Sequence, residues 1–395
     1  MISSEEALTI ILRNAFPFGE ERIPFLQATG RMLKEAIYAD RDFPPFDRVM
    51  MDGIALAYER VADGQTQFYL EKIQAAGNPQ LQLENPHHAI EVMTGAVLPK
   101  GTDTVIPYEK IDILNGVATL KELQINPNQH VHFQGSDRKK NDELVPKHTK
   151  ITPVEIGLLA TVGATEVLVS KTPNVLVLST GDELIEVDQL PAQHQIRRSN
   201  VYTLMSLLDQ SNITADEHHL PDDKPYLIEK IRDYLKTYDC ILCSGAVSKG
   251  KYDFLPEVFA ELGVQKHFHK VKQRPGKPFW FGSKGKCSIF AFPGNPVSTF
   301  VGACYYFSAW YNKGMGVTPE LPKAILMEEV VFKPELSYFL QVKCATNSGK
   351  LEATPVKGNG SGDLANLALA DAFLLLPANQ EKFNKGELYP LVSYR

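Results

Sequence analysis

Cysteine is scarce in this sequence, with five in 395 residues. Five thiols cannot all pair, and a chain of this size does not need disulfide bonds to supplement a small core. Cys240 and Cys243 form an isolated CxxC, but residues three apart in a strand point to opposite faces and would chelate a metal poorly. We therefore expect buried, reduced thiols and a cytoplasmic protein.

An excess of positive charge and a long apolar run are also missing. The formal net charge of −6 argues against general nucleic-acid binding, which favours a basic face. The longest uncharged stretch, 287–312, is broken by Pro293-Gly294-Asn295-Pro296, and the piece that follows is shorter than the ~20 apolar residues of a membrane span. Glu5 and Glu6 do not fit a signal peptide. We expect neither a nucleic-acid nor a membrane partner.

Two nucleotide-binding signatures are incomplete. Gly245-x4-Gly250-Lys251 approaches the phosphate-binding P-loop, but Tyr252 follows where that loop carries Ser or Thr for magnesium. No Gly-x-Gly-x-x-Gly follows the first strand candidate of the α/β region, so a dinucleotide-binding fold has little support. The sequence therefore argues against hydrolysis of nucleoside triphosphates.

The length favours two to four domains, since domains usually span ~100–200 residues. Residues 171–312 alternate short apolar runs with helical patterns, which predicts a three-layer α/β domain with a mostly parallel sheet. Its strand candidates are 174–179, 214–219, 239–243 and 287–291, and its helix candidates are 200–212, 224–237, 253–262 and 296–312.

The other regions predict smaller parts. Frequent turns over 54–135 predict a small inserted β-domain, and residues 319–395 contain further strands in a C-terminal, barrel-like β domain. Residues 1–53 and 136–170 form a mixed N-terminal part. Within it we expect helices at 3–14 and around 153–162, and a helical or part-helical segment at 20–40. The fold class is thus multidomain α/β plus β.

Three glycine-marked turns each follow an apolar run. They are Ser179-Thr180-Gly181-Asp182-Glu183-Leu184, Ser244-Gly245-Ala246-Val247-Ser248 and Pro293-Gly294-Asn295-Pro296-Val297-Ser298. A parallel sheet binds ligands at the carboxyl ends of its strands, where these turns would lie. Asn295 and Pro296 suit the N-cap and first position of a helix, whose amides attract oxyanions. A tight, well-capped strand-to-helix turn explains the third motif equally well.

Charged residues suggest an anionic ligand. Arg274-Pro275-Gly276-Lys277-Pro278 places two cations on a stiff turn, which suits phosphate or molybdate-like oxyanions, whereas Lys249 and Lys266 fit a solvated face. Carboxylates beside glycines, namely Asp52, Asp137, Asp182, Glu183 and Asp253, suit a hydrated magnesium ion if they converge in space. Taken singly, each fits a turn or cap, and Asp253 could cap its helix.

Taken together, these segments resemble the molybdopterin molybdenumtransferase family, which includes the gephyrin E domain. The matching motifs are Pro44-Pro45-Phe46-Asp47 with Met51-Asp52-Gly53, Met93-Thr94-Gly95-Ala96-x-x-Pro99 with Gly101-x-Asp103, Gly135-x-Asp137, the turn from Ser179 to Leu184, Ile196 with Ser199-Asn200, Ser244-Gly245-x-Val247-Ser248, Pro275-Gly276-Lys277-Pro278, and the turn from Pro293 to Ser298. Each motif alone is weak, but the ordered set over 44–298 is specific.

The resemblance implies an enzyme of molybdenum cofactor biosynthesis that inserts molybdate into adenylylated molybdopterin and releases AMP, with Mg²⁺. It implies a homodimer in which acids from the partner's N-terminal part complete the site, and contact with other molybdenum-cofactor proteins. The implied catalytic residues are Asp52, Asp137, Glu183 and Asp253, of which Glu183 and Asp253, with Asp182, hold the metal. The implied substrate-binding residues are Thr94, Thr180, Gly181, Asp182, Ser244, Gly245, Ser248, Lys270, Arg274, Lys277, Pro293, Gly294, Asn295, Ser298 and Ser361.

Several positions depart from the family pattern. Arg48 stands where the family often has Asn, Arg198 where it often has Asp, and Lys251 where an acid is common. Ala246 replaces a Gly, and Gln341 stands at the position of a family arginine. A charge reversal at ~4 Å and an effective dielectric of ~20 is worth several kcal/mol, so the added cations could weaken a metal site. Two alternatives therefore stay open: a non-catalytic pterin-binding or scaffold homologue, and a nucleotide-processing enzyme that shares only the α/β domain.

Overall fold

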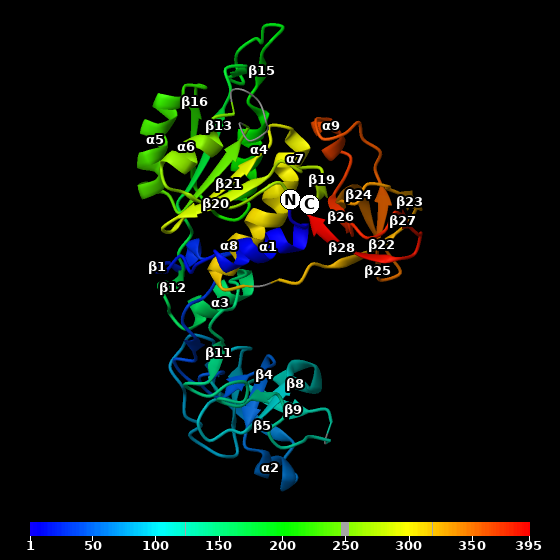
Figure 1. Cartoon of the computed structure of the whole chain (residues 1–395). Helices are drawn as coiled ribbons and strands as arrows, with labels where there is room; N and C mark the ends of the chain where they lie inside the picture. The colour runs from blue at the N-terminus through cyan, green and yellow to red at the C-terminus, as the bar shows by residue number, and fades with distance from the viewer. Residues whose placement is uncertain (123, 246–252, 318) are drawn as a thin grey trace. The chain divides into compact units, whose positions relative to one another are not determined.

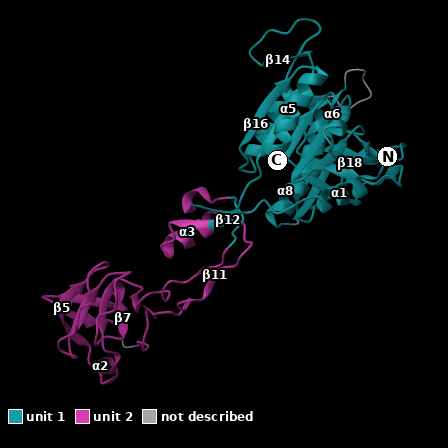
Figure 2. Cartoon of the chain, turned by 60° about the vertical axis from the view of Figure 1, so that its left-hand side comes forward, with its two compact units in different colours: residues 1–23, 30–34, 168–395 teal, residues 24–29, 35–167 magenta. Residues whose placement is uncertain are grey.

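The computed structural model describes residues 1–122, 124–245, 253–317 and 319–395, which form two compact units (Figure 2). Unit 1 comprises residues 1–23, 30–34 and 168–395. Unit 2 comprises residues 24–29 and 35–167 and is thus an insertion in the sequence of unit 1. None of the helices in the described ranges combines the length and the apolar character that crossing a bilayer requires.

A six-stranded sheet forms the centre of unit 1 in the described part of the chain, with the order β16-β13-β17-β21-β20-β18. Its strands are β13 (Val175–Thr180), β16 (Ala215–Leu220), β17 (Cys240–Ser244), β18 (Gln265–His269), β20 (Trp280–Lys284) and β21 (Cys287–Phe292). The first four in this order are parallel, and β20 and β18 are antiparallel. The predicted mostly parallel sheet and its four strand candidates are confirmed, whereas β18 and β20 were not predicted.

Helices cover both faces of this sheet (Figure 1). One face packs against α1 (Ser4–Arg13), α4 (Ser199–Asp209) and the helical run of α7 (Pro296–Gly302), a π-helical turn (Ala303–Phe307) and α8 (Ser308–Met315). The other face packs against α5 (Lys224–Thr237) and α6 (Leu255–Glu261). These two layers complete the predicted three-layer domain, because successive strand residues alternate between the two cores.

The CxxC pair follows this alternation. Cys240 lies in the core beneath α4 and α7, and Cys243 lies in the core beneath α5 and α6. Both side chains are free and buried, and burial raises the pKa of each thiol. The prediction of two buried thiols on opposite faces is therefore confirmed.

A five-stranded barrel follows in sequence. Within the described residues, β24 (Ser337–Asn347), β25 (Lys350–Pro355), β22 (Lys323–Leu326), β28 (Leu388–Ser393) and β26 (Ala372–Leu376) pair in a ring that closes from β26 back to β24. Strands β23 (Val330–Val331) and β27 (Lys382–Phe383) pair beside it, and α9 (Leu364–Leu367) lies between β25 and β26 in the sequence. The barrel-like C-terminal domain expected from the sequence is present.

Short strand β19 (Gln273–Arg274) joins this barrel to the basic turn. It pairs in parallel with β24, which places Arg274 opposite Tyr338. The basic turn therefore begins as part of the sheet that closes the barrel. The pairing with β24 therefore fixes the backbone direction at Arg274, where the basic turn starts.

Unit 2 contains a second six-stranded sheet in the described residues, with the order β7-β4-β6-β5-β9-β8. Its strands are β4 (Gly53–Leu56), β5 (Gln67–Gln74), β6 (Ala89–Val92), β7 (Thr104–Pro107), β8 (Ile111–Leu114) and β9 (Val117–Leu120). Short helices α2 (Tyr58–Ala62) and η2 (Tyr108–Lys110) connect some of them. Outside this sheet, β3 (Arg48–Val49) pairs with β10 (Val131–His132), and α3 (Pro153–Thr161) begins with a Thr152–Glu155 capping box.

Two local predictions were wrong. Residues 20–40 are not mainly helical: they form β1 (Glu20–Pro24), the three-residue 3-10 turn η1 (Phe25–Gln27) and β2 (Ile37–Tyr38). Strand β2 pairs with β11 (Glu143–Val145), so a distant segment decides its conformation over local propensity. Helix α6 begins at Leu255 with Phe254 at the N-cap position, so Asp253 is not its cap residue.

Candidate active site

The three glycine turns meet at the carboxyl ends of β13, β17 and β21. The amide of Gly245 donates to the carbonyl of Phe292 at 3.1 Å. A Cβ atom at Gly245 would lie 3.2 Å from the carbonyl oxygen of Thr180, and one at Gly294 would lie 3.8 Å from Cα of Gly245. Gly245 also has φ +99°, where L side chains are strained. This position therefore needs glycine so that the turns can approach one another.

Asn200 holds two of the turns together from α4. Its Nδ2 donates to Oγ of Ser244 and to the carbonyl of Gly294, both at 2.8 Å. Thr299 continues the connection, because its hydroxyl donates to the carbonyl of Pro293 at 2.6 Å. Asn200 was noted in the sequence only as part of Ser199-Asn200. Its position as the first residue of the predicted helix 200–212 was the signal that it could reach the neighbouring turns.

A cavity of about 120 Å³ lies where these turns meet. Its lining includes the predicted residues Thr180, Glu183, Ser244, Gly245 and Gly294. Ser248, which was also predicted to bind substrate, lies outside the described residues. The cavity thus gathers residues from three separate turns.

Thr180 carries the clearest sign that this cavity takes a ligand. The residue is 4% exposed, and its hydroxyl has no hydrogen-bond partner in the described part of the chain. Leaving a buried hydroxyl unpaired costs about 1–3 kcal/mol, so a polar group of a ligand is the expected partner.

Replacing Thr180 by valine tests this interpretation. Valine keeps the shape but removes a hydroxyl that the free protein does not satisfy, so the free energy of unfolding should stay unchanged or rise. Substrate binding should weaken about two- to tenfold, the worth of one neutral hydrogen bond. Urea unfolding and the KM for substrate measure the two quantities. A marked loss of stability would show that the hydroxyl has a structural role.

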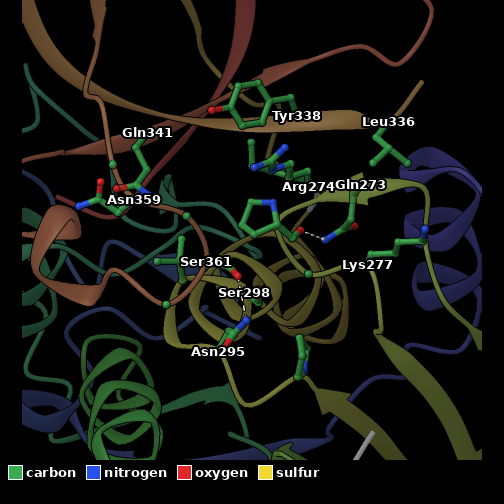
Figure 3. A pocket seen from close by; sticks show the side chains of 18 of the residues that line it. Gln273, Arg274, Lys277, Asn295, Ser298, Leu336, Tyr338, Gln341, Asn359 and Ser361 are labelled. Carbon is green, nitrogen blue, oxygen red and sulfur yellow. Dashed lines mark hydrogen bonds between the residues drawn. The ribbon is translucent and has the colours of Figure 1, made fainter. Parts of the chain in front are cut away.

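A larger cavity of about 830 Å³ lies between the start of α7 and the barrel (Figure 3). Six predicted site residues line it: Arg274, Lys277, Pro293, Asn295, Ser298 and Ser361. None of the described residues that line it is acidic. Two cations without a neighbouring carboxylate in the lining favour an anionic ligand. Lys270, also predicted, lines neither cavity and has a left-handed backbone with φ +76°.

Gln273 stiffens the turn that carries the two cations. The residue is 1% exposed, its Nε2 donates to the carbonyl of Pro275 at 3.0 Å, and its Oε1 accepts from the hydroxyl of Tyr306 at 2.5 Å. The guanidinium of Arg274 lies over the ring of Phe332, 5.9 Å from its centroid. The side chains of Arg274 and Lys277 therefore extend from a braced backbone, as the two prolines led us to expect.

Ser361 connects the barrel to the start of α7. Its hydroxyl accepts from Nδ2 of Asn295 at 2.8 Å, and its carbonyl accepts from the amide of Val297 at 3.1 Å (Figure 3). Asn295 occupies the predicted N-cap position, but its side chain makes no capping hydrogen bond. Since Ser361 already uses the Val297 amide, the helix start offers an oxyanion less than the sequence suggested. The positive charge of this cavity comes from Arg274 and Lys277.

Three carboxylates beside the first turn act on a fourth, Asp222. Burial raises the pKa of Asp222, and the negative charges of Asp182, Glu183 and Asp253 raise it further. The amide of Asp222 donates to Oδ1 of Asp182 at 3.3 Å. Within the described residues, no three His, Cys, Asp or Glu side chains lie close enough to hold a metal. Sequence reasoning missed Asp222, which follows the end of β16 as Asp182 follows the end of β13.

Replacing Asp222 by asparagine tests this repulsion. A carboxyl whose pKa is raised on folding contributes stability below its ordinary value of 3.8, and loses it as the pH rises through the raised pKa. At about pH 7 the ionised group is therefore unfavourable, and the variant should be at least as stable as the parent. The advantage should vanish in acid. Urea unfolding of the variant and the parent at both pH values measures this. A variant less stable than the parent at neutral pH only would contradict the prediction.

The basic departure Arg198 is balanced inside the protein. Its residue is 4% exposed, and its guanidinium contacts Glu186 at 2.6 Å and Glu217 at 3.0 Å. These hydrogen bonds also lower the pKa of Glu186. Arg198 lines the small cavity, as its expected place near the site requires, and the two glutamates offset the positive charge that it adds there. Oε1 of Gln341 accepts from Nδ2 of Asn366 at 2.8 Å, whereas Lys251 and Ala246 lie outside the described residues.

Asp52, Thr94 and Asp137 belong to unit 2, whereas the other described site residues belong to unit 1. Oδ1 of Asp52 accepts from the amide of Thr94 at 2.6 Å and from its hydroxyl at 2.7 Å. These two hydrogen bonds lower the pKa of Asp52. Oδ1 of Asp137 accepts from Nε2 of His132 at 2.8 Å. Both acids are exposed but held through one oxygen.

Three family models match successive parts of the chain. Residues 2–163 match the MoeA N-terminal region (domain I and II), residues 176–306 match a probable molybdopterin binding domain, and residues 323–392 match the MoeA C-terminal region (domain IV). A molybdopterin molybdenumtransferase from Synechocystis sp. is 39% identical over 399 residues, covering all of both chains. One from Staphylococcus epidermidis is 29% identical, covering 99% of this chain and 95% of that protein.

Solved structures agree with this result. The crystal structure of a molybdopterin biosynthesis moeA protein from Pyrococcus horikoshii OT3 superimposes with a TM-score of 0.83 at 27% identity, covering all of both chains. The similarity therefore extends over both units and is not confined to the α/β domain.

Proposed function

Since this chain belongs to the MoeA family and is an enzyme of molybdenum cofactor biosynthesis, we propose that it inserts molybdate into adenylylated molybdopterin and releases AMP. The observation that carries this proposal is the large cavity, which presents Arg274 and Lys277 on a braced turn without an acidic residue in its described lining. Molybdate and the two phosphate groups of the substrate are anionic, so a rigid cationic cavity suits them.

The cations have different roles in this proposal. The planar guanidinium of Arg274 can hold an oxyanion through two hydrogen bonds, whereas Lys277 acts as a point charge. Ser298, Asn295 and Ser361 supply neutral polar groups at the edge of the same cavity. The dithiolene sulfurs that bind molybdenum come from the substrate, so the reaction needs no protein nucleophile. The burial of four of the five cysteines agrees with that.

We propose that the pterin nucleotide extends towards the small cavity at the glycine turns. There the unpaired hydroxyl of Thr180 would accept a hydrogen bond from the pterin nucleotide or donate one to it. Ser244 and Gly245 would contact the substrate at the same place, because both line this cavity. Lys270 stays a predicted contact without a position in either cavity.

The carboxylates beside the first turn fit a magnesium ion that arrives with the substrate. Magnesium usually takes one or two carboxylates together with substrate phosphates and water, rather than a cage made of protein alone. One or two of the predicted ligands Asp182, Glu183 and Asp253 would supply such contacts, and their shared influence on Asp222 supports their proximity. Bound magnesium offsets negative charge on the phosphate that leaves with AMP. The mutual repulsion of the acids would decrease at the same time.

We also propose a homodimer in which Asp52, Thr94 and Asp137 of one subunit complete the site of the other. Exposed apolar side chains close to Asp52 and Asp137 in the sequence, namely Phe46, Met50, Met51 and Phe133, support a surface that contacts another chain. For the chain itself we propose four parts: 1–53 with 136–170, 54–135, 171–312 and 319–395. A cytoplasmic location and contacts with other molybdenum-cofactor proteins belong to the same proposal.

Incubation of the purified chain with adenylylated molybdopterin tests the proposed function. AMP should form only when molybdate and Mg²⁺ are both present, and chromatography would measure it. Tight pterin binding without AMP under saturating conditions would favour a non-catalytic homologue instead. That alternative relied on Arg198 and Lys251, and it is weaker now that Glu186 and Glu217 neutralise Arg198.

A further inference from the structure

A row of three polar side chains ends at Asp137 in unit 2. Arg48 and His132 lie opposite each other in the antiparallel pair β3–β10. Nη2 of Arg48 lies 2.9 Å from Nδ1 of His132, and Nε2 of His132 lies 2.8 Å from Oδ1 of Asp137. His132 therefore bridges a cation and a carboxylate through its two ring nitrogens.

The chemistry of these groups permits one arrangement of protons. A guanidinium only donates hydrogen bonds, so Nδ1 of His132 must accept from Arg48. An ionised carboxylate only accepts, so Nε2 must carry the proton and donate to Asp137. Which nitrogen of a histidine is protonated is set by the partner of the other nitrogen, and here that partner is Arg48.

Hydrogen bonds fix the backbone around Asp137, so only the rotation of its side chain remains to be set. The amides of Gly135 and Asp137 donate to the carbonyls of Pro44 and Phe43, each at 2.9 Å. The carboxylate of Asp137 is 55% exposed, so the hydrogen bond from the less exposed His132 ring selects its orientation. In the described part of the chain, Oδ2 of Asp137 accepts no hydrogen bond.

Asp52 is held in the same way by a different group. Thr94 occupies its Oδ1, and no described group donates to its Oδ2. The two acids of unit 2 that the proposed function assigns to the site thus each present one held and one free oxygen. Such orientation in advance is what a site needs if a carboxylate is to act on a bound ligand.

We propose that His132 is a positioning residue for Asp137, and that Arg48 fixes the tautomer in which it does so. The proposal rests on the proposed function, in which the free oxygen of Asp137 contacts the substrate complex. Arg48 stands where the family often has Asn. In this chain the arginine supports the site, because it holds His132. Neither Arg48 nor His132 touches the substrate in this account.

NMR of the full chain with isotope-labelled histidine tests the arrangement without any activity. The chain has 10 histidines, and His132→Gln identifies the signals of this one. We expect a proton on Nε2 and none on Nδ1 at neutral pH. A proton on Nδ1 would overturn the proposal whether or not the chain releases AMP, so its failure is distinguishable from failure of the proposed function.

Kinetics of AMP release test the positioning role. His132→Phe should lower kcat/KM about tenfold, the usual cost of losing a group that orients a site ligand. His132→Gln keeps a donor near the position of Nε2 and should retain most of the activity. Arg48→Met should show a smaller loss, which Arg48→Lys should restore because lysine can still donate to Nδ1.

The Asp137→Asn background provides the decisive control. If His132 acts only through Asp137, adding His132→Phe to Asp137→Asn should change kcat/KM less than about twofold. A further tenfold loss there would show that His132 acts elsewhere or supports the fold. Circular dichroism of each variant separates these two outcomes, and either one overturns the positioning role.

Discussion

Replacement of Asp52 by alanine should reduce the rate of AMP release by at least about 100-fold, as expected for the loss of a fixed charge that stabilises a transition state. Asp52 is exposed, and its carboxylate is held by the amide and hydroxyl of Thr94. The same hydrogen bonds lower its pKa, so the group is ionised throughout the neutral range. Because the side chain is exposed, the free energy of unfolding should change little.

A matched control exists in the same unit. Oδ2 of Asp142 accepts from the amide of Lys139 at 2.7 Å, and Asp142 is exposed as Asp52 is. Asp142→Ala removes a comparable hydrogen bond and should keep the parent's rate. Steady-state AMP release and circular dichroism measure both variants. Wholesale unfolding of Asp52→Ala, or a rate equal to that of the parent, would refute the assigned role.

Exchange of both Arg274 and Lys277 for glutamine should lower kcat/KM for adenylylated molybdopterin by about 100-fold or more. Hydrogen bonds to charged groups contribute about 1.5–3 kcal/mol each, and two of them are lost. Both side chains are exposed, and in the described ranges neither forms an ion pair. The fold should therefore tolerate the change, and most of the loss should appear in KM.

Lys266→Gln is the control for this double variant. Lys266 is an exposed residue of β18, and it lines neither cavity. The substitution Lys266→Gln removes a positive charge from the same basic stretch without touching the proposed site, so the KM of this variant should equal that of the parent. A similar rise in KM for Lys266→Gln would mean that general surface charge, rather than the cavity, attracts the substrate. Raising the salt concentration would then abolish the difference.

The sequence predicted β13, β17 and β21 of the central sheet because these three strands are buried on both sides. Such strands read as short apolar runs, as in Val175–Thr180 and Cys240–Ser244. Strand β18 lies at the sheet edge, and its sequence Gln265–His269 contains polar residues at four of five positions, so it resembles a charged loop. The helix prediction for residues 20–40 was wrong for another reason. Strand β2 in this segment depends on pairing with β11, which lies more than 100 residues away in the sequence.

The site could be predicted only in part, because several of its residues act through contacts between segments that are distant in the sequence. The glycine turns were visible because each follows a strand, and the structure brings three of them around one cavity. Asn200, Asp222 and His132 were not assigned roles, because each acts on a residue that only the fold places beside it. The two glutamates that offset Arg198 were not predicted for the same reason, since Glu186 and Glu217 are 12 and 19 residues away.

Sharing of one site between two subunits is the claim on which the rest of this account depends. Mixing Asp52→Ala chains with the Arg274→Gln/Lys277→Gln double variant, under conditions that exchange subunits, tests it most directly. Each variant alone should be nearly inactive. A mixed dimer would contain one site with both sets of residues intact, so AMP release should recover to roughly a quarter of the parent's rate after random exchange in a two-fold dimer. Mixed dimers without any recovered AMP release would contradict the account.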